Sequence, residues 1–128
     1  MVEFAIIIPI LLAVLLGIVE FARAWQIQQV VTNAAREGAR VAVTGNNDSA
    51  APVDAAIDTY LRSATIDMNE ATWTFNTQSG QHTGQADTVT VSYNYTYSLF
   101  GPVMNLLSSG GSTPGSVTLS STSIMRQE

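Results

Sequence analysis

FAIIIPILLAVLLGIV, residues 4–19, is a run of sixteen residues without a charge. At a rise of 1.5 Å per residue, a helix of this length extends about 24 Å, which is less than the roughly 30 Å of a bilayer core. Glu3 precedes the run, and Glu20 and Arg23 follow it. The run therefore predicts a helix that can just enter a membrane, with charged residues at its two ends.

Two residues that weaken helices, Pro9 and Gly17, lie inside this run. The ring of Pro9 leaves the carbonyl of Ala5 without its helical partner, so we expect local melting of the helix there. Helices in lipid tolerate such residues where neighbouring groups satisfy the freed carbonyls. We therefore expect Pro9 and Gly17 to give flexibility to a helix held among lipids or other helices.

The helical pattern continues past Val19 without a break, because small and apolar residues recur at alternating steps of three and four. Polar residues occupy the other faces, so residues 20–43 are amphipathic. One helix is thus predicted from about Val2 to about Val43, with residues 1–45 as an extended N-terminal domain. Its packing positions against the rest of the chain are Ile27, Val31, Ala34, Gly38 and Val41.

The remaining residues, 46–128, predict a small polar head that begins with a second helix. Pro52 suits the first turn of this helix, and Asp54 lies near the positive end of its dipole. One face carries apolar residues at helical spacing, namely Val53, Ala56, Ile57, Tyr60, Leu61 and Ala64. We expect this face to lie flat on the head.

Beyond Thr65 the hydrophobic period falls to two, which is typical of strands with one buried face. The alternating residues are Trp73 and Phe75 in a first strand, and Val89, Val91, Tyr93, Tyr95 and Tyr97 in a second. A third strand is predicted from Val117 to Met125, and its alternation slips between Leu119 and Ile124, which indicates a bulge. Helices that precede grouped strands give an α+β fold, in which a three-stranded antiparallel sheet packs on the helical seam.

Charged residues make up 12% of the chain, whereas soluble globular domains carry about 25%. This low charge content indicates that part of the surface does not meet water. The net charge is −5, with no lysine and with five arginines that are scattered singly. Because no basic stripe could neutralise phosphates, we expect no nucleic-acid partner.

The sequence offers no grouping typical of catalysis or metal binding. It has no cysteine, and its single histidine, His82, lies in a polar loop without a nearby cluster of carboxylates. The spacing of a calcium loop is absent from the head acids Asp48, Asp54, Asp58, Asp67 and Glu70. We therefore expect no catalytic residue, no metal site and no cofactor, and a membrane-tethered enzyme is the least supported class.

Four clusters in the first 43 residues carry a specific resemblance to a known family. They are VEFAIIIP at 2–9, LL at 11–12, GIVEFAR at 17–23 and TNAAREGAR at 32–40. In order and spacing they strongly resemble the TadE-like proteins, which are pilin-like subunits associated with Tad (tight adherence) pili, a branch of the type IV filament superfamily. The ending Ser123-Ile124-Met125-Arg126 also looks like that of the family, with a weaker signal.

The resemblance implies how such a chain is inserted, cleaved and assembled, and which partners it has. Such chains are inserted in the cytoplasmic membrane with the head outside, cut by a prepilin peptidase where a leader precedes them, and packed through the N-terminal helix into an extracellular filament. The partners implied are further copies of the chain or other pilins, and the membrane before assembly. Counting the arginines after the apolar run would instead point the head inward, and we follow the resemblance.

The candidate assembly residues are Glu3, Phe4, Ile7, Pro9, Leu11, Gly17, Glu20 and Arg23. A carboxylate at the edge of an apolar run is costly unless it is paired or stays near the interface. The resemblance implies that Glu3 pairs with the amino group of a neighbouring subunit, and the alternative is that Glu3 marks the wetted end of a membrane helix. For Glu20 and Arg23, a local pair along the helix is favoured over a pair across subunits.

Two functions stay open at this point. In the first, the chain is a structural subunit that polymerises into a pilus used for surface attachment. In the second, it stays in the membrane as a single-pass minor pseudopilin that initiates or regulates a pilus or secretion machine. Hydropathy alone does not separate a filament core from an anchor, because both need the same apolar helix.

Overall fold

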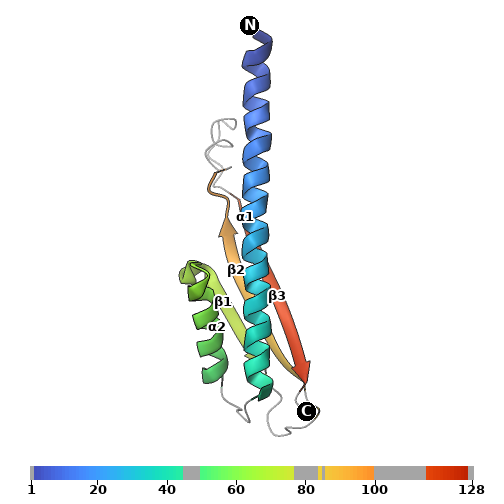
Figure 1. Ribbon diagram of the computed structural model, residues 1–128, viewed down its shortest axis with the longest axis vertical. Helices are drawn as coiled ribbons and strands as arrows, with labels where there is room; N and C mark the ends of the chain where they lie inside the picture. The colour runs from blue at the N-terminus through green and yellow to red at the C-terminus, as the bar shows by residue number, and fades with distance from the viewer. Residues whose placement is uncertain (1, 45–49, 77–83, 85, 100–114, 127–128) are drawn as a thin grey trace. The chain divides into compact units, whose positions relative to one another are not determined.

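The computed structural model describes residues 2–44, 50–76, 84, 86–99 and 115–126 (Figure 1). Its elements are the helices α1 (Val2–Thr44) and α2 (Ala51–Ser63), the short 3-10 helix η1 (Met68–Glu70), and the strands β1 (Ala71–Asn76), β2 (Ala86–Thr96) and β3 (Ser116–Arg126). Long helix, short helix and three-stranded antiparallel sheet follow in this order, which confirms the predicted α+β class.

The chain forms two compact units, one of residues 1–26 with 95–117 and one of residues 27–94 with 118–128. α1, β2 and β3 each contribute residues to both units. The predicted division into residues 1–45 and 46–128 concerns sequence segments, and it stays a prediction.

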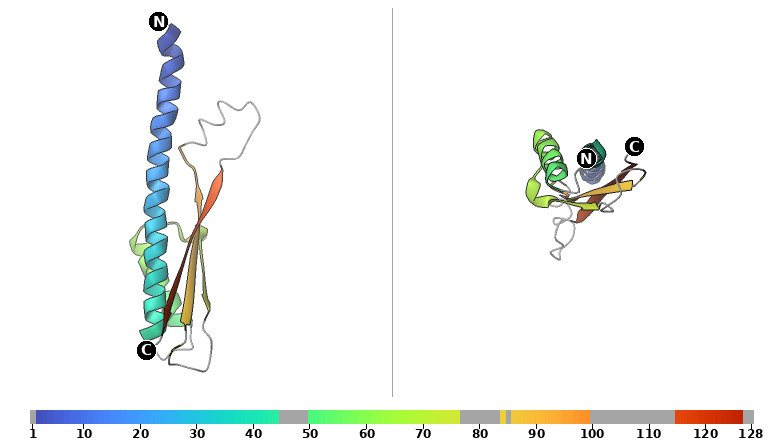
Figure 2. Two further views of the ribbon diagram at one scale, coloured as in Figure 1. Left: turned by 90° about the vertical axis from the view of Figure 1, so that its right-hand side faces the viewer. Right: turned by 90° about the horizontal axis from the view of Figure 1, so that it is seen from below.

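The second unit is a sheet with helices on one face. The strand order is β1-β2-β3, and β1 runs antiparallel to β2 in a register from Ala71 opposite Tyr93 to Asn76 opposite Thr88. α2 and the second half of α1 lie on the same face of this sheet (Figure 2). The buried side chains of β2 therefore alternate along the strand, as the period of two predicts.

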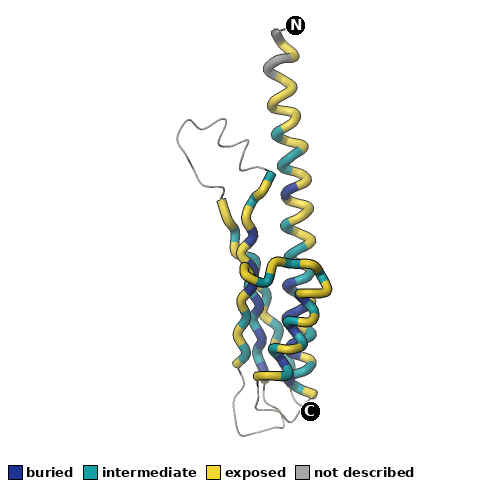
Figure 3. The backbone as a smooth tube through the Cα atoms, turned by 90° about the vertical axis from the view of Figure 1, so that its left-hand side faces the viewer, coloured by how far each residue is buried: buried dark blue, intermediate teal, exposed yellow. Residues whose placement is uncertain are grey.

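The core of the second unit lies between these helices and β2 (Figure 3). It comprises Val31, Ala34, Ala35, Ala39 and Ala42 from α1, Val53, Ile57 and Leu61 from α2, and Ala71, Val89, Val91 and Tyr93 from the strands. At Gly38 the approach is close, because an added Cβ would lie 2.8 Å from Cγ1 of Ile57 and 3.2 Å from Cγ1 of Val89. The small residues of α1 therefore permit close packing against α2 and the sheet.

Burial in β3 alternates without interruption from Ser116 to Arg126, so the bulge expected between Leu119 and Ile124 is wrong. The hydrophobic pattern breaks because polar and apolar residues do not follow this burial: Ser121 is half-buried, while Ile124 is 64% exposed. Residue polarity at this edge strand is therefore a poor guide to the side that faces the core.

Candidate functional site

In the first unit, the first half of α1 exposes large apolar side chains on all sides. Each of the following is 45–69% exposed: Phe4, Ile7, Ile8, Ile10, Leu11, Leu12, Val14, Leu15, Ile18, Val19, Phe21 and Trp25. Neighbouring positions in a helix differ by about 100°, so these residues surround the helix axis. A helix that is apolar all round belongs in a membrane or among other helices.

Within the described part of the chain, α1 is the one helix long and apolar enough to cross a bilayer. It runs through Pro9 without interruption, so the local melting expected there is wrong. Proline removes one hydrogen bond, and the turns on both sides of it keep theirs. Gly17 is half-buried, and an added Cβ there would meet no atom within 4 Å.

Glu20, the first charged residue after the apolar run, is only 2% exposed. Its Oε1 accepts hydrogen bonds from the hydroxyl of Tyr95 at 2.9 Å and from the backbone N–H of Ser98 at 2.8 Å. Its Oε2 accepts a longer bond of 3.3 Å from the N–H of Leu99. We call these four residues the Glu20 clamp. Three donors replace the water that a buried carboxylate loses, which is what such burial requires.

The local pair expected between Glu20 and Arg23 is wrong. The ion pairs between described residues are Arg40 with Glu37 at 2.6 Å and Arg62 with Asp58 at 2.7 Å, and Arg23 is in neither. A pair of exposed charges along a helix gives little stability, whereas three donors directed at a buried carboxylate give more. Glu20 therefore bonds to the end of β2 and the turn that follows, and Arg23 stays exposed.

Tyr95 holds the clamp from the strand side. Its ring meets that of Tyr97 edge to face, with centroids 5.5 Å apart and planes at 87°. Burial, followed by the hydrogen bond to the carboxylate of Glu20, raises the pKa of Tyr95 to about 12. The phenol is therefore a stable donor over the whole physiological pH range.

A hollow of about 330 Å³ lies beside the clamp and is lined by Gly17, Glu20, Phe21, Ala24 and Tyr97. Its walls are largely apolar, and the carboxylate of Glu20 is already engaged by its donors. Such a hollow suits an apolar group.

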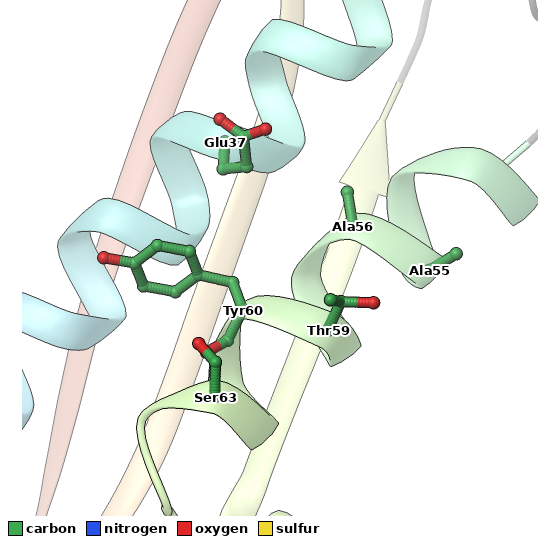
Figure 4. A pocket seen from close by; sticks show the side chains of 6 residues that line it. All are labelled: Glu37, Ala55, Ala56, Thr59, Tyr60 and Ser63. Atoms are coloured by element: carbon green, nitrogen blue, oxygen red, sulfur yellow. The ribbon is translucent and has the colours of Figure 1, made fainter.

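A second hollow, of about 450 Å³, lies in the second unit between α1 and α2 (Figure 4). It is lined by Glu37, Ala55, Ala56, Thr59, Tyr60 and Ser63. The carboxylate of Glu37 is bound by Arg40, and this hydrogen bond lowers the pKa of Glu37. Among the described residues, no three His, Cys, Asp or Glu side chains could hold a metal ion together.

The predicted packing positions of α1 differ in burial. Val31, Ala34 and Gly38 are buried, and Ile27 and Val41 are half-buried. Sequence reasoning missed the buried residues Ala35, Ala39 and Ala42, which lie next to the predicted stripe. A run of alanines beside the stripe is the signal that could have found them, because a helix that contacts two surfaces needs a wider apolar face.

The predicted assembly positions fall into two groups. The exposed ones are Glu3, Phe4, Ile7, Pro9, Leu11 and Arg23. Gly17 and Glu20 instead contribute to the first unit itself, since both line the hollow beside the clamp. Sequence reasoning missed Tyr95, Ser98 and Leu99 as partners of Glu20, because a contact between residues that lie 75 or more positions apart leaves no local pattern.

Residues 1–40 match the family model described as TadE-like protein, which confirms the resemblance. The match contains the exposed apolar half of α1, Glu20 and most of the stripe of small residues. Neither the comparison with curated proteins nor that with solved structures found a match. The family indicates a pseudopilin-like protein associated with the Tad pilus and with its other components, and the apolar helix fits a membrane-anchored member of that system.

Proposed function

We propose that this TadE-like chain is a structural subunit that polymerises through the first half of α1 into an extracellular Tad-type pilus used for attachment. The observation that supports it is the exposure of large apolar side chains around the whole helix between Phe4 and Val19. The role is structural and has no catalytic step.

The driving force of the proposed assembly is hydrophobic. Lipid tails cover these side chains while the helix is in the membrane, and they must be covered again once the subunit leaves it. Apolar surface removed from water contributes about 25 cal/mol per Å². Helices of other subunits offer the same kind of surface, so helix against helix is the natural replacement for lipid.

Glu3 is the proposed register residue. It is exposed, and it forms no ion pair with the described residues of its own chain. A carboxylate inside a packed core of helices would be costly without a partner. We propose that the amino terminus of a neighbouring subunit supplies the positive charge and fixes the axial position of each subunit. We further propose that the head lies outside the cytoplasm, and that a prepilin peptidase cuts any leader that precedes these residues.

The test is to shear cells that express the full gene, pellet the released material and examine it by electron microscopy and peptide mass spectrometry. Thin fibres with this chain as their dominant protein are expected, and Glu3→Ala should abolish them. Glu37→Ala is the control, because it removes a half-buried helical carboxylate, paired with Arg40, that lies outside the apolar run. Fibres that persist in Glu3→Ala would refute the register role alone.

The second candidate is a membrane-resident minor pseudopilin that initiates or regulates assembly. It is favoured by α1, which is long and apolar enough to cross a bilayer as a single anchor without any filament. Its signature in the same experiment is a chain that stays with the membrane fraction while other pilins are released by shearing.

A further inference from the structure

At the end of the apolar run, Arg23 is the charged side chain that reaches the surface. Glu3, Glu20 and Arg23 are the charged residues of positions 2–26. The carboxylate of Glu20 is buried and bound by its own chain, whereas Arg23 is exposed and unpaired among the described residues. The sequence alone suggests an ion pair of Glu20 with Arg23, but in the structure Glu20 is buried and the guanidinium of Arg23 lies at the surface.

Two aromatic residues, Phe21 and Trp25, lie two positions before and two positions after Arg23 in the sequence. Phe21 is 69% exposed and Trp25 is 59% exposed, and their rings stack with centroids 6.3 Å apart. They lie one helical turn apart on one side of α1. At about 100° per residue, Arg23 projects roughly 160° away from Trp25 on the other flank. The exposed groups therefore partly encircle the helix, and Phe21 also borders the hollow that Glu20 and Ala24 share with Tyr97.

Exposed rings and a guanidinium directly after an apolar run are typical of a bilayer interface. Tryptophan and other amphipathic aromatic rings concentrate at the level of lipid headgroups. Arginine binds lipid phosphate through charge-assisted hydrogen bonds, and anionic lipids attract such residues further. The apolar run of residues 4–19 ends directly before this position, so the headgroup layer would fall where the rings and the guanidinium lie.

We propose that Phe21, Arg23 and Trp25 form an interfacial collar that binds the headgroup layer of an anionic bilayer and sets the depth at which α1 inserts. The inference rests on the proposed membrane-inserted state of the subunit before assembly. The Glu20 clamp belongs to the same device, because it holds the carboxylate at this level within its own chain and leaves Arg23 as the charged group that reaches the headgroups.

Trp25 is a built-in reporter of depth. The chain has two tryptophans, so Trp73→Phe leaves Trp25 as the only one. The full chain with this change is reconstituted into vesicles of phosphatidylcholine and phosphatidylglycerol that carry bromine near either the headgroup end or the methyl end of the acyl chain. We expect blue-shifted emission that is quenched most by the shallow bromines. Emission typical of water, or strongest quenching by the deep bromines, would overturn the proposal.

A second variant keeps the test independent of any folding defect in Trp73→Phe. Trp25→Phe leaves Trp73 in place, and it should lose the quenching by shallow bromines that the unmodified chain shows. If the unmodified chain and Trp25→Phe are quenched equally, Trp25 is not at the interface and the collar is refuted.

The charge is tested by comparing brominated phosphatidylglycerol with brominated phosphatidylcholine as quenchers of Trp25. We expect the preference for the anionic lipid to fall about fivefold in Arg23→Gln, which corresponds to the loss of about 1 kcal/mol per arginine near an anionic surface. Arg36→Gln is the matched control, since it removes an exposed arginine farther along α1, and it should leave the preference unchanged. Equal preferences in all three proteins would refute the role of Arg23.

A protein partner would give a different result. If a second copy covers Trp25, quenching by brominated lipid should fall as the protein-to-lipid ratio rises, and this outcome would also overturn the collar. The shearing experiment addresses the filament separately, because a subunit that never forms fibres can still insert at the predicted depth.

Discussion

The hydroxyl of Tyr95 donates a 2.9 Å hydrogen bond to Oε1 of Glu20. This bond ties the end of β2 to α1 at the first residue after the apolar run. The N–H of Ser98 reaches the same oxygen at 2.8 Å, so one carboxylate oxygen orders both a side chain and a turn. A buried acid at this position is compatible with an apolar surrounding because its hydrogen-bonding capacity is used within its own chain.

We expect Glu20→Gln to destabilise the clamp by about 2–3 kcal/mol, because the amide presents its own NH₂ donors to groups that also donate. Tyr95→Phe should cost about 1.5–2 kcal/mol through the loss of one bond to a charged acceptor. The double variant should cost less than the sum of the two, since the bond can be lost only once. Hydrogen exchange at the amides of Ser98 and Leu99, together with urea unfolding in detergent, measures these changes. Additive effects would contradict the clamp, and Glu37→Gln serves as a control at a helical carboxylate outside it.

Alkaline pH should lower the free energy of unfolding through the ionisation of Tyr95. Burial and the bond to Glu20 raise the pKa of Tyr95 to about 12, whereas the unfolded chain has a value of about 10. The native state therefore holds a proton that the unfolded state has lost between these values, so stability is complete below about pH 10 and falls as pH rises toward 12. Urea midpoints measured from pH 9 to pH 11 should fall less in Tyr95→Phe than in the unmodified chain. Because burial also raises the pKa of Tyr93, Tyr95→Phe should retain part of the slope.

The sequence predicts what depends on local period, and it misses what depends on distant contacts. Helical steps of three and four predicted α1 to within one residue of its end, and the period of two predicted β2. Both patterns arise because one face of the element is buried. The partner of Glu20 was missed because Tyr95 lies 75 residues away, while Arg23 lies at the local spacing that a sequence reader tests first. The exposure of Ile124 was missed because residue types do not fix which face of an edge strand meets the core.

Trp73 should help to hold α2 to β1. Its indole N–H donates a 2.9 Å hydrogen bond to Oδ1 of Asp54 in the first turn of α2. Trp73→Phe keeps most of the apolar ring and removes the donor, so we expect a loss of about 1–2 kcal/mol in the free energy of unfolding. Asp54→Asn keeps an acceptor oxygen and should cost less. A loss in Asp54→Asn as large as that in Trp73→Phe would show that the charge near the helix dipole, rather than the indole bond, is what matters.

The two glycines described in α1 should respond to alanine in opposite directions. At Gly38 the new methyl group would lie 2.8 Å from Cγ1 and Cδ1 of Ile57 and 3.2 Å from Cγ1 of Val89, so either α1 or its neighbours must move. We expect Gly38→Ala to cost about 1–3 kcal/mol, which is typical of an overfilled core.

Gly17→Ala is the control, because the added methyl meets no atom within 4 Å and alanine favours a helix by up to about 1 kcal/mol. The comparison is made by urea unfolding in one detergent, followed by the electron microscopy of sheared fibres. Ile57→Val removes one of the two crowding carbons, so it should recover part of the loss in Gly38→Ala. If Gly38→Ala is as stable as Gly17→Ala, the close approach of α1 to α2 and β2 does not limit the packing of the head. If Gly17→Ala folds normally but forms no fibres, the open space at Gly17 is needed by a neighbouring subunit rather than by the fold.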